Sequence, residues 1–369
     1  MTPLALGYVP LLDAAPLVVA REMGFAEEEG LSLTLTRAAS WSQLRDMLDS
    51  GAVAAAHMLS AMPVARALGL GGGTGATEVL MVLSLGGQVI GLSGDLGRRI
   101  GAGFGDPVAL GAALGRSPLR LGVPFPFSMH ALLLRYWLSR AAPGLAPQIV
   151  VVPPPRMAAA LKAGEIDGFC VGEPWGSAAV AEAGAQIVLT GSHIWSQSPE
   201  KVLAARKGWG EAAGPLLRAL WRAGRWADTA ENSATLAEIL ARAEYLDTSA
   251  LHIEPALQGR VADQLVPDLI HFHDGTANFP WRSQAGWIGA ELAEAHGLNP
   301  GAAIATARAC FRSDLYRRHL AGLAPMPRSS DKAEGALEAS ESLPAVSGSL
   351  RLSRNRFFDG AVFDPAPAA

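Results

Sequence analysis

The first two hundred residues or so alternate short β-like apolar runs with helical patterns. The β-like runs, each followed by a segment with apolar residues three to four positions apart, lie at 4–9, 31–36 and 53–59, and again at 119–124, 148–153 and 166–172. A β-α-β-α-β-α order predicts a parallel sheet covered by helices. Because the order occurs twice, we expect an α/β protein with two lobes, each a mostly parallel sheet flanked by helices.

Two segments between and after the repeats read as crossings from one lobe to the other, at 81–93 and 191–205, and a mainly helical part follows. The predicted organisation is lobe 1 with the helical C-terminal part at 1–84 and 204–325, lobe 2 with the crossing strands at 85–203, a flexible linker at 326–350 and a hairpin docking on the body at 351–369. The linker is predicted from its Ser, Ala and Pro content, and the hairpin from Asp359-Gly360 between apolar pairs.

Composition narrows the class of protein. The chain has 369 residues, 50% of them hydrophobic, and a formal net charge of -4, so it is long enough for two cores and lacks the basic field that direct nucleic-acid binding needs. We find no signal-peptide pattern at the N-terminus and no run of about eighteen apolar residues, so we predict no membrane insertion and a cytoplasmic location. The two cysteines, Cys170 and Cys310, predict no disulfide framework.

A tryptophan stands at a predicted helix start in "ASWSQLRDML". Ser40 followed three residues later by Gln43 is a capping-box pattern, which makes Trp41 the first helical residue, where free backbone N–H groups gather. Trp41 either packs the entry loop, as most tryptophans do, or forms the wall of a pocket.

The second repeat contains a matching helix start. In "FPFSMH", Ser128 is a plausible N-cap and His130 lies in the first turn of the helix after the first strand of lobe 2. Ligands of open α/β sheets bind at the carboxyl ends of strands, so two facing lobes would direct two helix N-termini at one anion. A single histidine is more often structural, but this position favours a role in binding.

The crossings provide two further candidates. Lys201 lies in the return crossing and either reaches water or neutralises an anion, and the sequence gives these alternatives equal weight. Gln88, in the first crossing, can donate through its amide. Trp41, Gln88, His130 and Lys201 would then surround one small ligand. We find no grouping of nucleophile and base, and therefore predict no catalytic residues and no enzyme activity.

Several motifs together resemble the nitrate- and bicarbonate-binding proteins of the NrtA/CmpA family, among them "GYVPLLDAAPLVVA", "PFSMHALLLRYWL" and "SPEKVLA". The resemblance covers about 4–325 and resumes at 357–365. It implies a two-lobe type II periplasmic-binding-protein fold with an oxyanion between the lobes. It also implies that the oxyanion is held by Trp41, Gln88, His130 and Lys201, and that Ser42 adds its hydroxyl or backbone amide.

The residue at position 201 bears on the choice of ligand. Nitrate only accepts hydrogen bonds and benefits from a compensating positive charge, and Lys201 is expected to provide both. The resemblance implies that a bicarbonate binder has an acidic residue there, often with calcium nearby. We therefore expect nitrate or nitrite as the ligand, with no metal and no cofactor.

The N-terminal sequence favours a regulatory role. Relatives without an export signal resemble the cytoplasmic nitrate/nitrite sensor NasS, which implies an RNA-binding antiterminator protein, similar to NasT, as the partner. The first hypothesis is such a sensor in nitrate assimilation. The alternatives are a solute-binding component of an ABC-type nitrate or bicarbonate transporter, and an enzyme on the same fold, which would need an acid/base pair in the cleft.

Overall fold

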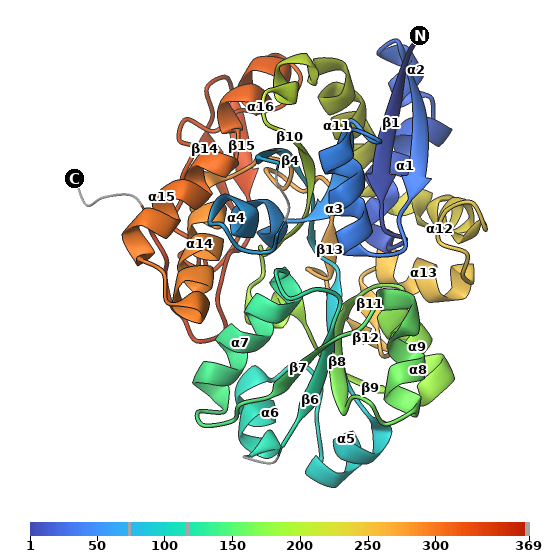
Figure 1. Cartoon of the computed structure of the whole chain (residues 1–369), viewed down its shortest axis with the longest axis vertical. Helices are drawn as coiled ribbons and strands as arrows, with labels where there is room; N and C mark the ends of the chain where they lie inside the picture. The colour runs from blue at the N-terminus through green and yellow to red at the C-terminus, as the bar shows by residue number, and fades with distance from the viewer. Residues whose placement is uncertain (73–74, 116–117, 366–369) are drawn as a thin grey trace.

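The computed structural model describes residues 1–72, 75–115 and 118–365, and it shows two α/β lobes one above the other (Figure 1). This architecture confirms the predicted fold class, a periplasmic-binding-protein fold with a substantial helical part. No helix among the described residues is both long and apolar enough to cross a membrane.

Lobe 1 is built on a six-stranded sheet of order β13-β4-β10-β3-β1-β2. Its strands are β1 Thr2–Tyr8, β2 Leu31–Arg37, β3 Ala55–Leu59, β4 Thr77–Gly86, β10 Pro199–Arg206 and β13 Ile270–His271. The helices that belong to this part of the chain are η1 Leu12–Ala14, α1 Ala15–Glu22, α2 Phe25–Glu28, α3 Trp41–Ser50 and α4 Ala61–Ala67. β1 pairs in parallel with β2 and β3, as the first repeat predicts, whereas β10 is antiparallel to both neighbours.

Lobe 2 has a five-stranded sheet of order β7-β6-β8-β5-β9. Its strands are β5 Gln88–Leu92, β6 Arg120–Val123, β7 Gln148–Val151, β8 Gly168–Gly172 and β9 Gln186–Thr190. Its helices are α5 Gly94–Ile100, α6 Pro107–Leu114, α7 Met129–Ala141, η2 Pro154–Arg156, α8 Met157–Lys162, α9 Trp175–Ala183 and α10 Gly191–Ile194. In each lobe the strand that follows a crossing, β10 in lobe 1 and β5 in lobe 2, is antiparallel and lies beside three strands that are parallel to one another. The two sheets therefore share one strand order as well as one sequence pattern.

The chain passes between the lobes at two places. The first is at Gly86 and Gly87, whose φ angles of +65° and +92° lie where glycine is favoured, and a Cβ at Gly86 would lie 2.5 Å from the Leu269 carbonyl oxygen. The return crossing occupies 195–198, between α10 of lobe 2 and β10, which belongs wholly to the sheet of lobe 1. The predicted boundary at 203 therefore lies several residues too late, and Lys201 is a lobe 1 residue.

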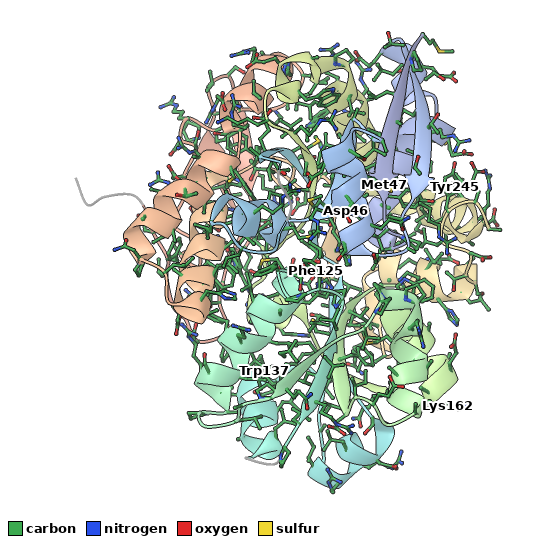
Figure 2. The ribbon with its side chains drawn as sticks, in the orientation of Figure 1. Asp46, Met47, Phe125, Trp137, Lys162 and Tyr245 are labelled. Carbon is green, nitrogen blue, oxygen red and sulfur yellow. The ribbon has the colours of Figure 1, made fainter. Side chains whose placement is uncertain are left out.

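The helical part follows β10 and completes lobe 1. Its elements are η3 Trp209–Ala212, α11 Gly214–Ala227, η4 Ala230–Asn232, α12 Ser233–Ala241, α13 Ala250–Leu257, β11 Arg260–Val261, β12 Gln264–Leu265, α14 Arg282–His296, α15 Pro300–Cys310 and α16 Ser313–His319. α11 packs on α1, and α14 and α15 pack on α4. Figure 2 shows Trp137 of α7 inside lobe 2, and Phe125, in the loop before α7, at the level where the lobes meet.

The segment 326–350, expected to be a flexible linker, is anchored to the body. Glu334 is fully buried and accepts hydrogen bonds from Ser283 Oγ of α14 (2.6 Å) and Asn355 Nδ2 (2.7 Å). The segment also forms β14 (Glu341–Pro344), which pairs with β15 (Ser349–Leu352). A buried carboxylate needs partners, and these partners fix the middle of the segment in spite of its small-residue composition.

The C-terminal residues dock as expected but do not form the expected hairpin. Asp359-Gly360 is a turn, yet its flanks bridge to other segments, Phe357 to Trp195 and Phe363 to Glu334. The hairpin of this region is β14–β15 instead. Of the predicted hairpin range 351–369, residues 366–369 lie outside the described residues.

Candidate functional site

The first wall of the candidate site is the start of α3. Ser40 has extended backbone angles, and its Oγ accepts a hydrogen bond from the Gln43 N–H (3.2 Å), as the capping pattern predicts. The Gln43 side chain accepts from the N–H of Ala39, one residue before the position that a capping box uses. Trp41 is 2% exposed, and its Nε1 has no hydrogen-bond partner among the described residues. Ser42 is half-buried beside it.

The second wall is the start of α7 in lobe 2. Ser128 is the N-cap, because its Oγ accepts from the Ala131 N–H (3.2 Å), and His130 is the second helical residue. Its ring is buried, and neither nitrogen has a hydrogen-bond partner in the described part of the chain. A Cβ at Gly172 would lie 3.9 Å from His130 Nε2 and 3.7 Å from Asp13 Oδ2 of lobe 1. Side chains from both lobes therefore lie within 4 Å of one position.

Gln88 begins β5 and faces the same space. It pairs with Gly172 in an antiparallel register, and paired residues of an antiparallel ladder have their side chains on one face of the sheet. Gln88 is fully buried, and neither its amide nitrogen nor its amide oxygen has a partner among the residues described. A Cβ at Gly191 would lie 2.5 Å from the Gln88 side chain, so a glycine is required there.

Lys201 is fully buried and held by two carboxylates. Its Nζ donates to Asp13 Oδ2 (2.6 Å) and to Glu200 Oε1 (2.7 Å), and it lies 5.5 Å from the centre of the Trp41 ring. Glu200 Oε1 also lies 3.2 Å from His130 Nδ1, an ion-pair distance without hydrogen-bond alignment. The His57 ring is 6.0 Å from that of Trp41, and its Nε2 is 2.9 Å from Asp13 Oδ1.

The structure therefore brings together Trp41, Gln88, His130 and Lys201, and adds three residues that the sequence reading missed. Asp13 lies in η1, directly after β1, at the carboxyl edge that the fold assigns to ligands. His57 is in β3, where its neighbours are apolar. Glu200 precedes Lys201, and alternation along a strand would place it on the opposite face. Register shifts on both sides of Lys201 bring both side chains into one cluster.

The charges of the cluster nearly cancel. Burial raises the pKa of Asp13, but Lys201 and His57 outweigh it and lower that pKa to about 2. Burial lowers the pKa of Lys201, but Asp13 and Glu200 outweigh it and the net change is upward. Burial raises the pKa of Glu200 to about 7, although Lys201 opposes the change. Burial, with Lys201, holds the pKa of His130 well below its usual value, so the ring is neutral at pH 7.

This balance corrects the expected role of Lys201. The sequence suggested a positive charge available to compensate a bound anion, but Asp13 already compensates it, and Glu200 adds a partial negative charge. Lys201 retains one N–H beyond those given to Asp13 and Glu200. What the cluster offers a ligand is a set of buried N–H donors from Trp41, Gln88 and His130 that lack partners in the described chain, which suits a small hydrogen-bond acceptor.

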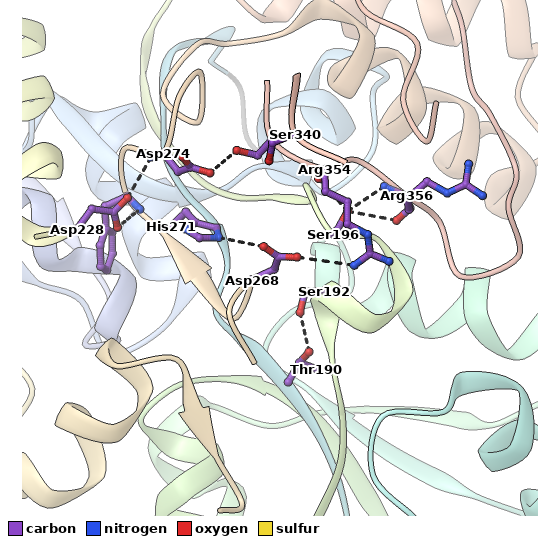
Figure 3. Close-up of polar contacts among 12 residues, drawn as sticks. Thr190, Ser192, Ser196, Asp228, Asp268, His271, Asp274, Ser340, Arg354 and Arg356 are labelled. Carbon is purple, nitrogen blue, oxygen red and sulfur yellow. Dashed lines mark hydrogen bonds and ion pairs between the residues drawn. The ribbon is translucent and has the colours of Figure 1, made fainter. Parts of the chain in front are cut away.

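An open cavity of about 680 Å³ lies elsewhere, lined by residues of the segments 225–233, 257–259, 267–275 and 351–354. Several of its charged groups interact with one another: Asp268 lies 3.5 Å from His271 Nε2 and 3.8 Å from Arg354 Nη1 (Figure 3), both at ion-pair distance without a hydrogen bond to His271 Nε2. Asp228 accepts from the His273 and Asp274 backbone N–H groups. No group of three metal-ligating side chains occurs within the described ranges. We therefore place the candidate site in the buried cluster.

Comparison with known sequences identifies the family. The sequence model of the NMT1-like family matches residues 1–241. The nitrate/nitrite binding protein NrtA of Synechococcus elongatus is 33% identical over an alignment of 392 residues. The alignment covers 98% of this chain and 83% of that protein. The nitrate import ATP-binding protein NrtC of Synechocystis is 36% identical over 307 residues, 79% of this chain but only 45% of NrtC. The chain thus spans less than half of that relative.

Comparison with solved structures supports the fold independently. The crystal structure of the periplasmic nitrate-binding protein NrtA from Synechocystis superposes with a TM-score of 0.84 at 27% identity, over 99% of this chain and 96% of that one. A ligand-binding component of an ABC-type import system from Staphylococcus aureus superposes with a TM-score of 0.67 at 16% identity, over 86% of this chain and 99% of that one, and shows the fold alone.

Proposed function

This chain belongs to the NrtA/CmpA family of nitrate- and bicarbonate-binding proteins, a family of binding proteins and not of enzymes, and we propose that it binds nitrate or nitrite between its lobes. The proposed contacts are the indole N–H of Trp41, the amide of Gln88, the imidazole of His130 and the remaining N–H of Lys201, with Ser42 at the edge. The observation that carries the proposal is the convergence of buried donors without partners within the described chain, because an unsatisfied buried donor is costly unless a ligand pairs with it.

The donor set favours an anion that only accepts hydrogen bonds. Nitrate and nitrite have no proton to donate, and the side chains of Trp41, Gln88, His130 and Lys201 all carry N–H groups. Bicarbonate also donates, and Glu200 Oε2, which is buried without a partner in the described chain, is the acceptor that it would need. Bicarbonate is therefore the competitor that any binding experiment must include.

The proposed role of binding is regulatory, in the cytoplasm. We propose that the anion closes the lobes and thereby changes the surface presented to an RNA-binding antiterminator protein of the NasT kind. Two hydrogen bonds between the lobes support closure as the response. The Leu12 N–H of lobe 1 donates to the Glu173 carbonyl oxygen (2.9 Å), and Trp175 Nε1 of lobe 2 donates to the Pro10 carbonyl oxygen (2.8 Å). A ligand shifts such an equilibrium only by its differential affinity for the two forms.

The second candidate role is that of a solute-binding part of a nitrate importer. It is suggested by the names of the relatives NrtC and NrtA, which describe import and periplasmic binding. Affinity purification from cells grown with and without nitrate separates the two roles. A sensor should co-purify with a small RNA-binding regulator that nitrate releases, whereas an import component should co-purify with transporter subunits.

Calorimetric titration of the purified chain with nitrate, nitrite, bicarbonate and an alkanesulfonate tests the binding proposal directly. We expect saturable, one-site binding of nitrate or nitrite, weakened in Trp41→Phe because the variant lacks the indole donor. Trp226→Phe is the matched control, because Trp226 is a half-buried tryptophan on α11, outside the cluster. Folded protein that binds neither nitrate nor nitrite at any pH between 5.5 and 8.5 would contradict the proposed function.

A further inference from the structure

The cluster between the lobes contains more acid than base. Asp13 and Glu200 both contact the single ammonium of Lys201, at 2.6 and 2.7 Å, and all three side chains are buried. A bound anion would be a third negative charge beside one positive charge. Like charges within a few ångströms in a buried site repel strongly, so an anion cannot be accommodated beside two ionised carboxylates without some compensation.

His130 shows where the compensation can come from. Its Nδ1 lies 3.2 Å from Glu200 Oε1, and its Nε2, which has no partner among the described residues, would lie 3.9 Å from a Cβ at Gly172. When Glu200 is ionised, its negative charge favours the proton of the neutral ring on Nδ1, which leaves a bare lone pair at Nε2. Nε2 would then be a hydrogen-bond acceptor facing the anion. Nitrate and nitrite also only accept hydrogen bonds, so no hydrogen bond could form between the ring and the anion.

We propose, on the premise that nitrate or nitrite binds in this cluster, that each bound anion is accompanied by one proton from solvent, held by the pair formed by Glu200 and His130. With the extra proton, either Glu200 becomes a neutral acid and the ring carries its proton on Nε2, or the ring becomes a cation with protons on both nitrogens. Both distributions remove one unit of negative charge from the protein and turn Nε2 into a donor. The proton belongs to the pair, because the two groups titrate together.

The remaining titratable groups that face the pair do not supply the proton. Asp13, from η1, is held ionised by Lys201 and His57. His57, from β3, is neutral because burial lowers its pKa more than Asp13 raises it. Cys170, from β8, remains a thiol because burial, with Glu200, raises its pKa well above the usual value. Among the pair and these three neighbours, only Glu200 changes its protonation near neutral pH, because burial raises its pKa to about 7. Burial also raises the pKa of Glu173 to about 7, but its carboxylate is bonded to the backbone N–H and hydroxyl of Ser177 on α9.

Proton uptake makes anion affinity depend on pH in a specific way. Below pH 7 the pair already carries the proton, and affinity should be nearly constant. Above pH 7 the proton must be taken from solvent, and affinity should fall by roughly tenfold for each pH unit. A site with a fixed, fully charged donor set would show no such dependence in this range.

The experiment is calorimetric titration of the whole chain with sodium nitrate, and with sodium nitrite, at pH 5.5 and at pH 8.5. At each pH the titration is repeated in two buffers with different ionisation enthalpies, because the difference in the measured heat gives the number of protons taken up. We expect close to one proton per anion at pH 8.5 and close to none at pH 5.5. Measurable binding at pH 8.5 without proton uptake would overturn the inference and leave the proposed function intact.

Two variants locate the proton. Glu200→Gln, which resembles the protonated acid, should bind nitrate without proton uptake at pH 8.5 and with an affinity that does not fall above pH 7. Glu291→Gln is the matched control: burial also raises the pKa of Glu291 to about 7, but this glutamate lies on α14 near Arg140 and Asp359, outside the cluster. It should take up the same number of protons as the unmodified chain. Uptake that persists in Glu200→Gln would assign the proton elsewhere and refute the inference.

Discussion

The burial of Glu200 predicts that an isosteric amide stabilises the ligand-free protein at alkaline pH. A carboxylate with a raised pKa binds its proton more tightly in the folded than in the unfolded chain. Glu200 is such a group, because burial outweighs the attraction of Lys201. The folded state should therefore lose stability as the pH rises from the unfolded pKa through the folded one. Glu200→Gln has no proton to lose and should escape this loss.

The magnitude follows from the two pKa values. The pKa of Glu200 is about 7, against 4.5 for a glutamate without protein surroundings. Each pKa unit corresponds to about 1.4 kcal/mol, so the ionised form is less stable by on the order of 3 kcal/mol. A chain of 369 residues has an unfolding entropy near 0.8 kcal/mol per degree, so Glu200→Gln should melt about 4 °C higher than the parent at pH 8.5. At pH 4.5 the two should melt within about 1 °C of each other.

Differential scanning calorimetry without nitrate, at half-unit steps between pH 4.5 and 8.5, measures this difference. Glu182→Gln is the control, because Glu182 is an exposed glutamate on α9 and the substitution removes the same charge from the surface. The control should follow the parent at every pH. A Glu200→Gln protein that melts at the parent temperature at pH 8.5, or that gains stability equally at pH 4.5, would refute the reasoning about burial and protonation.

Three further predictions concern the cluster and the C-terminal segment. Lys201→Met should lower the free energy of unfolding by about 3–5 kcal/mol at pH 8 in urea, because Asp13 would lose its ammonium partner; a loss below 1 kcal/mol would contradict the buried pair. Trp41→Phe should weaken nitrate binding by roughly tenfold in calorimetry and leave the melting temperature nearly unchanged, since one charge-assisted donor is lost and little area; equal affinity would remove Trp41 from the site. Asn355→Ala should cost about 2 kcal/mol in urea denaturation, because Trp195 Nε1, which donates to Asn355 Oδ1 at 2.7 Å, would be left buried without its partner.

The fold was largely predictable because its signals are local and repeated. Strand runs and helix starts such as Ser40 and Ser128 follow from periodicity and capping chemistry, and both N-caps are present in the structure. The boundary of the return crossing was misplaced because nothing in the sequence of β10 tells which of the two sheets this strand joins. The linker was mistaken because a few buried partners, above all Glu334, outweigh a composition that is otherwise typical of a loop.

The candidate-site residues at helix starts were predictable from the sequence, whereas those on strands were less so. Trp41 and His130 follow from two facing N-termini, which repeat symmetry indicates. The same reasoning applies to Asp13, because it lies between β1 and α1. No sequence motif distinguishes it from an ordinary residue at a helix start, so it was not selected. Glu200 was not predictable, since a register shift that breaks alternation depends on the neighbouring strands.

The pairing of Glu200 with His130 connects three events in one equilibrium. Glu200 belongs to β10 of lobe 1 and His130 to α7 of lobe 2, so their 3.2 Å contact exists only when the lobes are together. If the pair holds the proton that accompanies the anion, then closure, protonation and anion binding favour one another, and within each pair of these events the coupling free energy is the same in both directions, as linkage requires. Opening the lobes would separate the pair, expose Glu200 to water and release the proton. A partner that binds only the open form would therefore compete with both the anion and the proton, and its affinity should rise with pH at a fixed nitrate concentration.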